Sequence, residues 1–441
     1  MTSPALWIPE VWFLLTCSRP VSNWLHVGTK LDAEAVTSQI AEGNSIDRAV
    51  CTALIIFGMV VLLRREKVRQ TLRHCWPICL FLGYCLLSVS WSEFAGIAFK
   101  RWIREVGNLV MILIVWTDAH PMTALKRLMS RASYTLIPLS VLFCRYYPFG
   151  RSYGTWTGEL SYTGVSEDKN GLAQICLLFG LASIWQLLNL LGDDQNRASR
   201  RRHMVVHCAI LVMVVYLFVL ADSVTSRACL GLATIVLIAA RTRLFARRKM
   251  LVHLLMLLVV AIPVCVAIFG ASPAALQAMG RDSTLSDRTL IWTWVVKLVP
   301  NIWVGAGYGS FWLGQRVDLM VQNVTHTWVP YQAHNGYLDI FANLGWVGVA
   351  LLGVVIVHGY LRCIRLWRGG HPAGDLMLAY FVVGVVSNVT EASFFRNMFP
   401  IWLVFMLAIT VPLLKREEST EKVKRPIKLS GSDVQYVFGI S

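Results

Sequence analysis

The sequence predicts an all-α, polytopic integral membrane protein. Of its 441 residues, 56% are hydrophobic and only 15% are charged, which is more apolar than a soluble domain of this length. The net charge of +16 comes from short basic clusters between apolar stretches. This pattern is typical of loops that orient a membrane protein, so we expect lipids rather than nucleic acid as anionic partners.

Apolar segments that could cross a bilayer occur about twelve times along the chain, since a span of about 20 residues covers a hydrocarbon core of about 30 Å. The expected spans are residues 5–25, 47–63, 75–91, 95–117, 129–145, 171–191, 204–221, 227–240, 250–270, 337–361, 375–392 and 397–414. They divide the chain into nine spans (1–270), a large loop (271–336), three spans (337–414) and a tail (415–441). Residues 6–25 lack a basic leader and a small-residue cleavage site, so we expect a retained helix.

Basic residues fall in alternate connections, which predicts that those connections are cytoplasmic. The clusters are Arg64, Arg65, Lys67, Arg69 and Arg73; Lys126, Arg127 and Arg131; Arg197 and Arg200 to Arg202; Arg241 to Lys249; and Arg362, Arg365 and Arg368. The same alternation places both termini in the cytoplasm. It places residues 146–169 and 271–336 on the opposite, extracytoplasmic side.

The large loop is expected to contain an amphipathic helix that lies on the membrane surface. Ser286 is the expected N-cap, and Arg288 would then lie in the first turn, where unpaired backbone N–H groups favour a phosphate. The alternative is that Arg288 only reaches lipid headgroups. The expected apolar face is Leu290, Ile291, Trp294, Val295 and Leu298, opposite Thr289, Thr293 and Lys297.

Further charged residues are predicted at the same membrane face. Lys100, Arg101, Arg104 and Glu105 share one face of the fourth span near its outer end. Arginines at this depth need an anionic partner, which could be a substrate or, alternatively, Glu93 or Glu105.

Two short polar turns lie on that side as well. Ser223 and its neighbours are explained by a capped helix start, which leaves Arg227 unexplained, and Asp168 could cap the helix that begins beside Lys169.

No cofactor or metal site is predicted. The glycines of residues 305–309 do not match a nucleotide-binding loop, so we expect a tight aromatic turn there. His207, His253 and His358 lie on apolar helices without further ligands at metal-binding spacing and are interpreted as packing residues. The eleven cysteines form no C-x-x-C pair and are interpreted as small core residues.

Three runs of sequence stand out: residues 280–292 (GRDSTLSDRTLIW), 304–312 (VGAGYGSFW) and 333–339 (AHNGYLD). Together they resemble the O-antigen ligase and polymerase superfamily, and most of all its bacterial exopolysaccharide polymerase branch. The pairs Lys169-Asn170 and Ser226-Arg227 add weaker likeness. Asp287 is a departure, because glycine is expected before the arginine. The order of spans extends the resemblance over most of the chain.

The resemblance implies a glycosyltransferase at the periplasmic face of the inner membrane that uses a glycan carried on polyprenyl (undecaprenyl) diphosphate. Arginines would stabilise the departing diphosphate, and a histidine would deprotonate the acceptor hydroxyl. The implied catalytic residues are His334 and Arg288. The implied substrate-binding residues are Arg227, Arg101, Arg104, Lys169, Asn335 and Asp339, of which Asn335 and Asp339 could orient His334. In-line attack would invert the anomeric centre. No metal is expected, because no D-x-D pair is found on an outer loop.

Three functions remain open at this point. A polymerase would extend a lipid-linked glycan, and a ligase would transfer the glycan to lipid A core. A non-enzymatic transporter would be expected to show internal repeats, and none is evident. Besides a lipid-linked donor, an acceptor and membrane lipids, polysaccharide export or chain-length regulator proteins are candidate partners.

Overall fold

The computed structural model describes residues 2–25, 43–153, 159–191, 197–248, 250–269, 284–326 and 329–412. The chain divides after Val411, and everything described below belongs to the unit that ends there. This unit is mainly helical, with one small sheet in which β1 (Arg151–Tyr153) pairs antiparallel with β2 (Leu160–Tyr162). The predicted tail, residues 415–441, lies outside the described residues.

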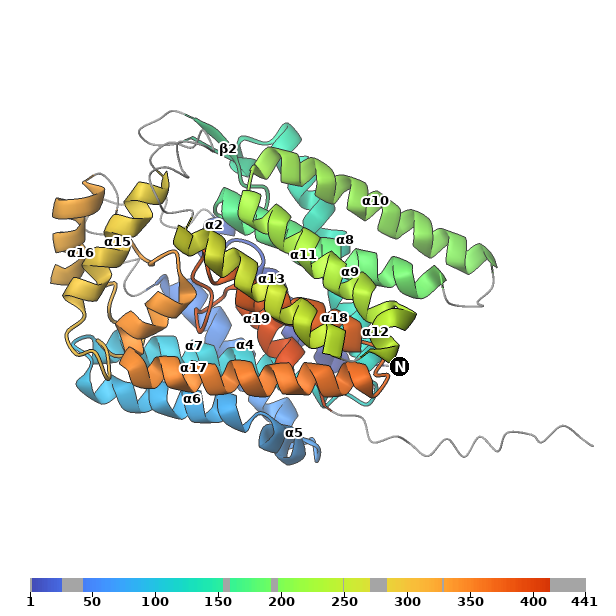
Figure 1. The fold of residues 1–441 in the computed structure, drawn as a ribbon, viewed down its shortest axis with the longest axis horizontal. Helices are drawn as coiled ribbons and strands as arrows, with labels where there is room; N and C mark the ends of the chain where they lie inside the picture. Colours follow the sequence, from blue (N-terminus) through green and yellow to red (C-terminus); the bar gives the residue numbers. More distant parts are fainter. Residues whose placement is uncertain are drawn as a thin grey trace, which may run out of the picture. The chain divides into compact units, whose positions relative to one another are not determined.

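The helices follow the predicted segments closely (Figure 1). The first part of the chain contains η1 (Pro4–Leu6), α1 (Trp7–Thr16), α2 (Val21–Trp24), α4 (Ser45–Leu63), α5 (Val68–His74), α6 (Trp76–Leu87), η2 (Ser88–Trp91), α7 (Ala95–Trp116), α8 (Pro121–Tyr146), η3 (Pro148–Gly150), α9 (Lys169–Leu191), α10 (Arg197–Ala221), α11 (Val224–Arg241), α12 (Arg243–Arg247) and α13 (Met250–Phe269). The loop region contains α15 (Thr284–Leu298), α16 (Gln315–Met320) and the π-helical η4 (Val321–Thr325), and the chain continues with α17 (Gly336–Arg368), α18 (Gly374–Ser387) and α19 (Pro400–Thr410).

Each predicted span overlaps a helix, but twelve membrane crossings are not confirmed. Within the described residues, α4, α9, α10, α11 and α17 are long and apolar enough to cross a bilayer, and a sixth crossing results if residues 68–91, bent by 81°, count as one span. α7 is long enough to cross a bilayer, but Lys100, Arg101, Arg104 and Glu105 make it more charged than those helices. The first expected span is broken, because α1 ends at Thr16 and Pro20 precedes α2.

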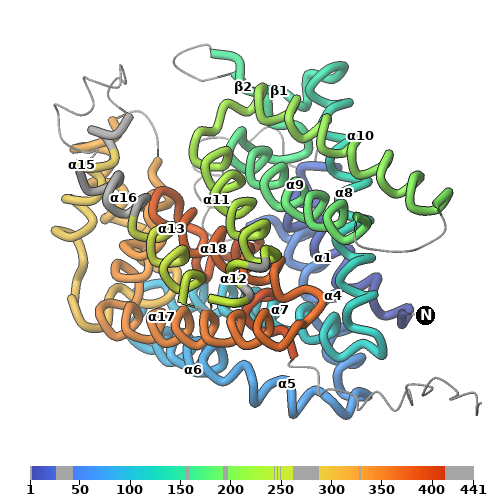
Figure 2. Tube along the Cα trace, turned by 45° about the vertical axis from the view of Figure 1, so that its right-hand side comes forward, coloured from blue at the N-terminus to red at the C-terminus, as the bar shows by residue number. Residues whose placement is uncertain are grey.

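The interior of the unit is built around α9, α18 and α19. Nearly every residue of α18 and every residue of α19 is buried, and both ribbons lie in the interior in Figures 1 and 2. By contrast, α10 exposes Val212 (70%) and Val219 (68%) on its outer side. Such apolar exposure on long helices is what a lipid-facing surface requires.

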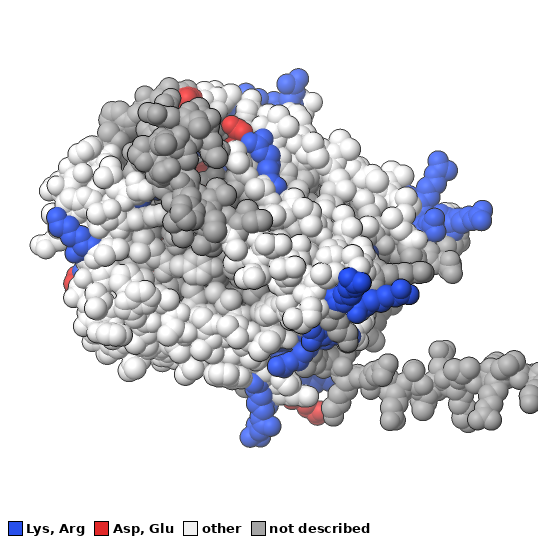
Figure 3. All heavy atoms as spheres, in the orientation of Figure 1, with Lys and Arg blue, Asp and Glu red and all other residues white. Residues whose placement is uncertain are grey.

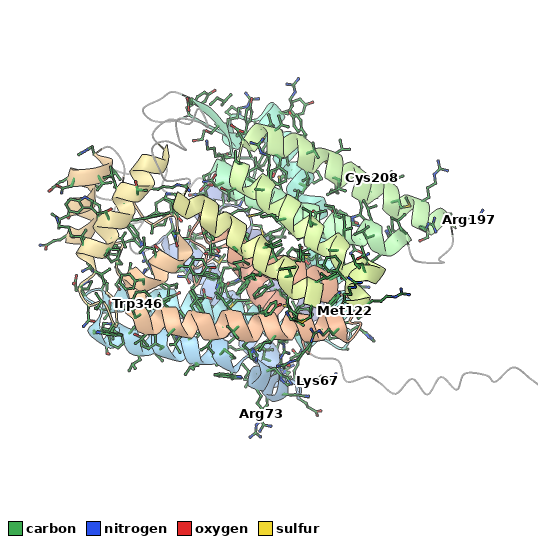
Figure 4. All side chains as sticks on the ribbon, viewed as in Figure 1. Lys67, Arg73, Met122, Arg197, Cys208 and Trp346 are labelled. Carbon is green, nitrogen blue, oxygen red and sulfur yellow. The ribbon has the colours of Figure 1, made fainter. Side chains whose placement is uncertain are left out.

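Charged side chains are unevenly distributed over the surface. On the face shown in Figure 3 the middle is mostly uncharged, and lysines and arginines gather toward the right and the lower right. Figure 4 places Arg197 at the right and Lys67 and Arg73 at the bottom of the same view, whereas α15 and α16 lie at the upper left. The labelled residues of two predicted cytoplasmic clusters are thus separate in this view from the helices of the large loop.

A break within α17 is closed by the glycine-rich turn predicted at residues 305–309. Gly345 has φ 62° and ψ −165°, a conformation open essentially to glycine alone, and it interrupts the helical hydrogen bonds. Residues 302–307, which lead into and begin this turn, bond to the backbone on either side of the break. Trp346 N donates to Ile302 O (2.9 Å), Val347 N to Trp303 O (3.1 Å), Ala306 N to Ala342 O (3.1 Å) and Gly307 N to Asn343 O (2.8 Å). Because these backbone groups find partners across the break, this irregular segment can be buried.

The helix in the large loop differs in part from its prediction. α15 begins at Thr284, so Ser286 lies inside it and does not cap it, and Arg288 falls in the second turn. Ile291 and Val295, expected to face the membrane, are instead buried against Phe311, Trp312 and their neighbours in a small second core, and Leu290 is 50% exposed. Apolar spacing identified the helix but did not fix its start. Residues 280–283 of the loop motif lie outside the described residues.

Candidate active site

Arg288 and His334 each approach a different oxygen of one carboxylate, that of Glu391. The Arg288 guanidinium is 3.7 Å from Glu391 Oε1, and His334 Nδ1 is 3.5 Å from Glu391 Oε2. Arg288 also donates to the backbone oxygen of Thr390 at 3.0 Å. The three side chains are 27%, 18% and 11% exposed, so the group is shielded while solvent still reaches it.

The turn after α18 brings Glu391 to this point. Asn388, fully buried, donates to Gly384 O (2.6 Å) and accepts from the backbone N–H groups of Ser393 (2.8 Å) and Phe394 (3.1 Å). Gly336 N, at the start of α17, donates to Asn388 O (2.8 Å) and Glu391 O (3.1 Å). A Cβ at Gly336 would lie 2.0 Å from Asn388 Oδ1, so only glycine allows this approach. The backbone of Glu391 is thereby fixed beside the residues that follow His334.

His334 itself is held from both sides. It has φ 51°, a left-handed conformation that is uncommon for a non-glycine residue and that often marks a functional position. After it, Asn335 caps α17 by accepting from Tyr337 N and Leu338 N. Before it, Asp339 Oδ1 accepts from Ala333 N (3.1 Å) and from Trp312 Nε1 (2.8 Å). Asn335 and Asp339 thus fix the backbone on either side of His334.

The two acidic residues offered as partners for the charged side chains of α7, Glu93 and Glu105, are each bonded to other side chains. Glu93 pairs with Arg316 at 2.8 Å, and Glu105 accepts from Trp402 Nε1 (2.5 Å) and Asn108 Nδ2 (3.0 Å). Arg101 donates to Gly309 O.

The two polar turns predicted on the outer side both contain the expected helix caps. Ser223 caps α11 by accepting from Ser226 N, and Asp168 accepts from Gly171 N at 2.6 Å at the start of α9, so both capping expectations are confirmed. Arg227 pairs with Asp222 at 2.8 Å on the surface, and Lys169 is exposed.

Two adjoining cavities open beside these residues. We name the first, of about 550 Å³, the polar cavity, and its lining includes Glu391 and Gln332. The second, of about 520 Å³, is the basic cavity, lined by Lys100, Arg101 and Asp339 among others. Both are bordered by Gly43, Arg104, Tyr331, Arg396 and Asn397. His334 and Arg288 are not among the residues that line them, and Glu391 connects the pair to the polar cavity.

The sequence prediction missed Glu391, Arg396 and Gln332. Arg396 donates to Gln332 Oε1, and its guanidinium lies 5.2 Å from the ring centre of Tyr331 and 5.3 Å from that of Phe399. Gln332 Nε2 in turn lies 3.4 Å from His334 Nδ1. A signal was present, because Glu391 and Arg396 stand at the predicted outer ends of the last two spans, and ionisable residues at such depth are usually functional.

Residues 209–353 match the profile of the O-antigen ligase family (Wzy_C). The predicted family resemblance is confirmed. The chain is 22% identical over 314 residues to the "Exopolysaccharide production protein ExoQ" of Rhizobium meliloti, which covers 70% of this chain and 69% of that protein. It is also 22% identical over 353 residues to the "Putative polysaccharide ligase" of Rickettsia bellii, which covers 75% of this chain and 79% of that protein.

The matched O-antigen ligase region holds only part of the site. It contains Arg227, Arg288, His334, Asn335 and Asp339. The α7 arginines lie before this region, and Glu391 and Arg396 lie after it. Three separate parts of the chain therefore meet at the two cavities.

Proposed function

We propose that this protein is a bacterial inner-membrane glycosyltransferase that polymerises repeat units carried on polyprenyl diphosphate. The observation that supports this most is the meeting of His334, Arg288 and Glu391 beside a cavity bordered by further arginines. The named relatives add support from polysaccharide production, although they are similar at low identity. The site faces the periplasm in this proposal, and both termini are cytoplasmic.

His334 acts as the general base. Two groups compete for His334 Nδ1: the Glu391 carboxylate at 3.5 Å favours a proton on Nδ1, whereas the Gln332 amide nitrogen at 3.4 Å can donate only to an unprotonated Nδ1. We assign the proton to Nδ1 because the carboxylate carries a full charge, and Nε2 is then left to accept the proton of the acceptor hydroxyl. The hydroxyl oxygen then attacks the anomeric carbon while the bond from that carbon to the diphosphate oxygen breaks. The electron pair leaves with the diphosphate, and in-line displacement inverts the anomeric centre.

Arginines stabilise the departing diphosphate. Arg104 and Arg396 border both cavities and Arg101 lines the basic one, so their charge surrounds the space where a diphosphate would leave. Arg288 has a second task in the structure, since its contacts with Thr390 and Glu391 hold the carboxylate that orients His334. Arg227 and Lys169 are assigned to the outer entry of the substrate, and residues of this chain suffice for the chemistry without a metal.

Transfer to lipid A core is the second candidate, favoured by the family description and by the name of the Rickettsia relative. Both reactions use the same donor and the same base. Purified protein should be given a lipid-linked oligosaccharide with and without lipid A core. Longer lipid-linked glycan in both mixtures supports a polymerase, glycan on lipid A core only in the second supports a ligase, and no transfer in either contradicts both.

The periplasmic location has its own test. Single cysteines at positions 288 and 334, in a background without the eleven native cysteines, should both react with a membrane-impermeant thiol reagent added outside intact spheroplasts. A cysteine at position 73, in a predicted cytoplasmic cluster, should react only after lysis. Labelling of 288 and 334 from opposite sides would refute the site.

A further inference from the structure

The two adjoining cavities differ in the charge of their linings. The carboxylates of the polar cavity are Asp47, Glu167, Asp168 and Glu391, and its cations are Arg104 and Arg396. The basic cavity has four cations, Lys100, Arg101, Arg104 and Arg396, and one carboxylate, Asp339. Of these charged residues only the two arginines line both cavities, so the sign of the lining charge changes at the boundary between the cavities.

The basic cavity suits an amphiphile with an anionic head. A diphosphate gains from several guanidinium groups, which match its oxygens in pairs and stay charged. The rest of this lining is largely apolar, including Ile97, Trp312, Ile340, Leu344 and Phe395, as an isoprenoid chain requires.

The polar cavity suits a neutral, hydroxyl-rich ligand. A diphosphate would meet four carboxylates there and be repelled. A glycan carries no such charge, and its hydroxyls both donate and accept, as amide and carboxyl side chains do. The amides of this lining are Asn23, Asn44, Asn170, Gln174, Gln332 and Asn397. Its volume of about 550 Å³ is that of an ordinary small-molecule site.

The two side chains next to His334 Nδ1 belong to the polar side of the boundary. Glu391 and Gln332 line only the polar cavity, and each lies within 3.5 Å of His334 Nδ1. The shared arginines, Arg104 and Arg396, lie between this side and the basic cavity. A hydroxyl activated in the polar cavity would therefore face a diphosphate in the basic cavity, as inversion demands.

The geometry points to a division of the two substrates: the polar cavity binds the acceptor glycan, and the basic cavity binds the diphosphate and the first isoprene units of the donor. This assignment rests on the proposed glycosyl transfer. It adds a glycan-binding role for α9, through Asn170 and Gln174, that lies outside the matched family region.

Binding to the full-length protein in lipid nanodiscs tests the division without turnover. The probes are undecaprenyl diphosphate and the repeat oligosaccharide released from the producing strain's own polysaccharide. Arg101→Gln should weaken the binding of undecaprenyl diphosphate about tenfold to a hundredfold, because a charge-assisted contact is lost. The Kd for the oligosaccharide should stay within about twofold of wild type. Gln174→Leu should weaken the binding of the oligosaccharide about threefold to tenfold and leave the Kd for undecaprenyl diphosphate unchanged.

A second pair of variants guards against misfolding. Lys100 lines the basic cavity, so Lys100→Gln should give the same result as Arg101→Gln. Asn170 lines the polar cavity, so Asn170→Ala should give the same result as Gln174→Leu. Melting temperature and elution volume must match wild type for a variant to be scored. If each variant weakens both probes equally, or the effects are reversed, the division is wrong.

Turnover separates this inference from the proposed function. If wild-type protein transfers glycan but the binding effects do not divide, the function stands and the division fails. If the binding effects divide but no glycan is ever transferred, the cavities are as assigned and the glycosyltransferase proposal fails. In an active preparation, Gln174→Leu should raise the KM for the acceptor and Arg101→Gln the KM for the donor.

Discussion

Arg288 and His334, 46 positions apart in the sequence, approach opposite oxygens of the same carboxylate, at 3.7 and 3.5 Å. Neither distance is that of a tight ion pair, and solvent reaches all three groups. Glu391 therefore couples the positions of an arginine and a histidine that the sequence could only place in the same loop. The predictions below test this coupling and the frame around it.

Replacing His334 by alanine should abolish glycan transfer while leaving the protein inserted and abundant. Loss of a general base lowers the rate by about 10² to 10⁴. The matched control is His253→Ala. The His253 side chain contacts Tyr360 and Arg368, which lie toward the end of α17, whereas the site lies at the start of that helix. Turnover of a lipid-linked repeat unit by purified protein measures both, and near-normal activity of His334→Ala would overturn the assignment.

Glu391→Gln keeps the size of the side chain but removes its charge. Because the carboxylate orients the His334 ring and holds Arg288, we expect kcat to fall at least about tenfold with little change in the KM for either substrate. Glu391→Asp keeps the charge on a shorter stem and should retain more activity than the glutamine variant. Equal kcat in wild type and Glu391→Gln would show that His334 needs no carboxylate partner.

Arg288→Lys preserves the positive charge and loses the forked guanidinium. One arginine end now meets Thr390 O and the other the Glu391 carboxylate, and an ammonium group cannot span both. Activity should fall about tenfold to a hundredfold, with Arg288→Ala lower still. Initial rates at saturating donor decide the matter, and full activity of the lysine variant would mean that charge alone is sufficient.

Gly345→Ala should destabilise the fold through the break in α17. The positive φ alone costs about 1–3 kcal/mol for a side-chain-bearing residue, and a Cβ would lie 2.2 Å from Trp303 C. Gly353→Ala on the same helix has nothing within 4 Å of the added methyl and should be neutral or stabilising by up to about 1 kcal/mol. Melting temperatures in one detergent compare the two, and equal effects would contradict the bond exchange at Gly345.

The contact between Glu93 and Arg316 should make a small, pH-dependent contribution to stability. The hydrogen bond from Arg316 lowers the pKa of Glu93 below its usual value of 4.5. Its contribution is thus present above that value and is lost as the pH falls through the lowered folded-state pKa. Glu93→Gln should reduce stability at pH 7 by less than about 1 kcal/mol, and the difference should vanish in strong acid. A difference that grows on acidification would contradict this sign.

The sequence by itself determined the class of the protein and the positions of its helices. Long apolar runs bounded by basic clusters report local transfer free energies, which need no knowledge of tertiary contacts. The loop motif, by its likeness to a family, singled out His334 and Arg288, whose roles stay a prediction. The spacing of Ile291 and Val295 predicted which side of α15 is apolar, but not that this side packs against the protein.

Only the tertiary structure decided which of these side chains contact one another. Glu391 was hidden because the predicted span 375–392 read as one apolar segment, whereas the bonds of Asn388 end α18 and turn the chain toward α17. The start of α15 and the partners of Glu93 and Glu105 were equally open, because a charge in an apolar region signals only that it needs a partner. Which partner it finds depends on contacts between residues distant in sequence, and these are set by how the helices pack.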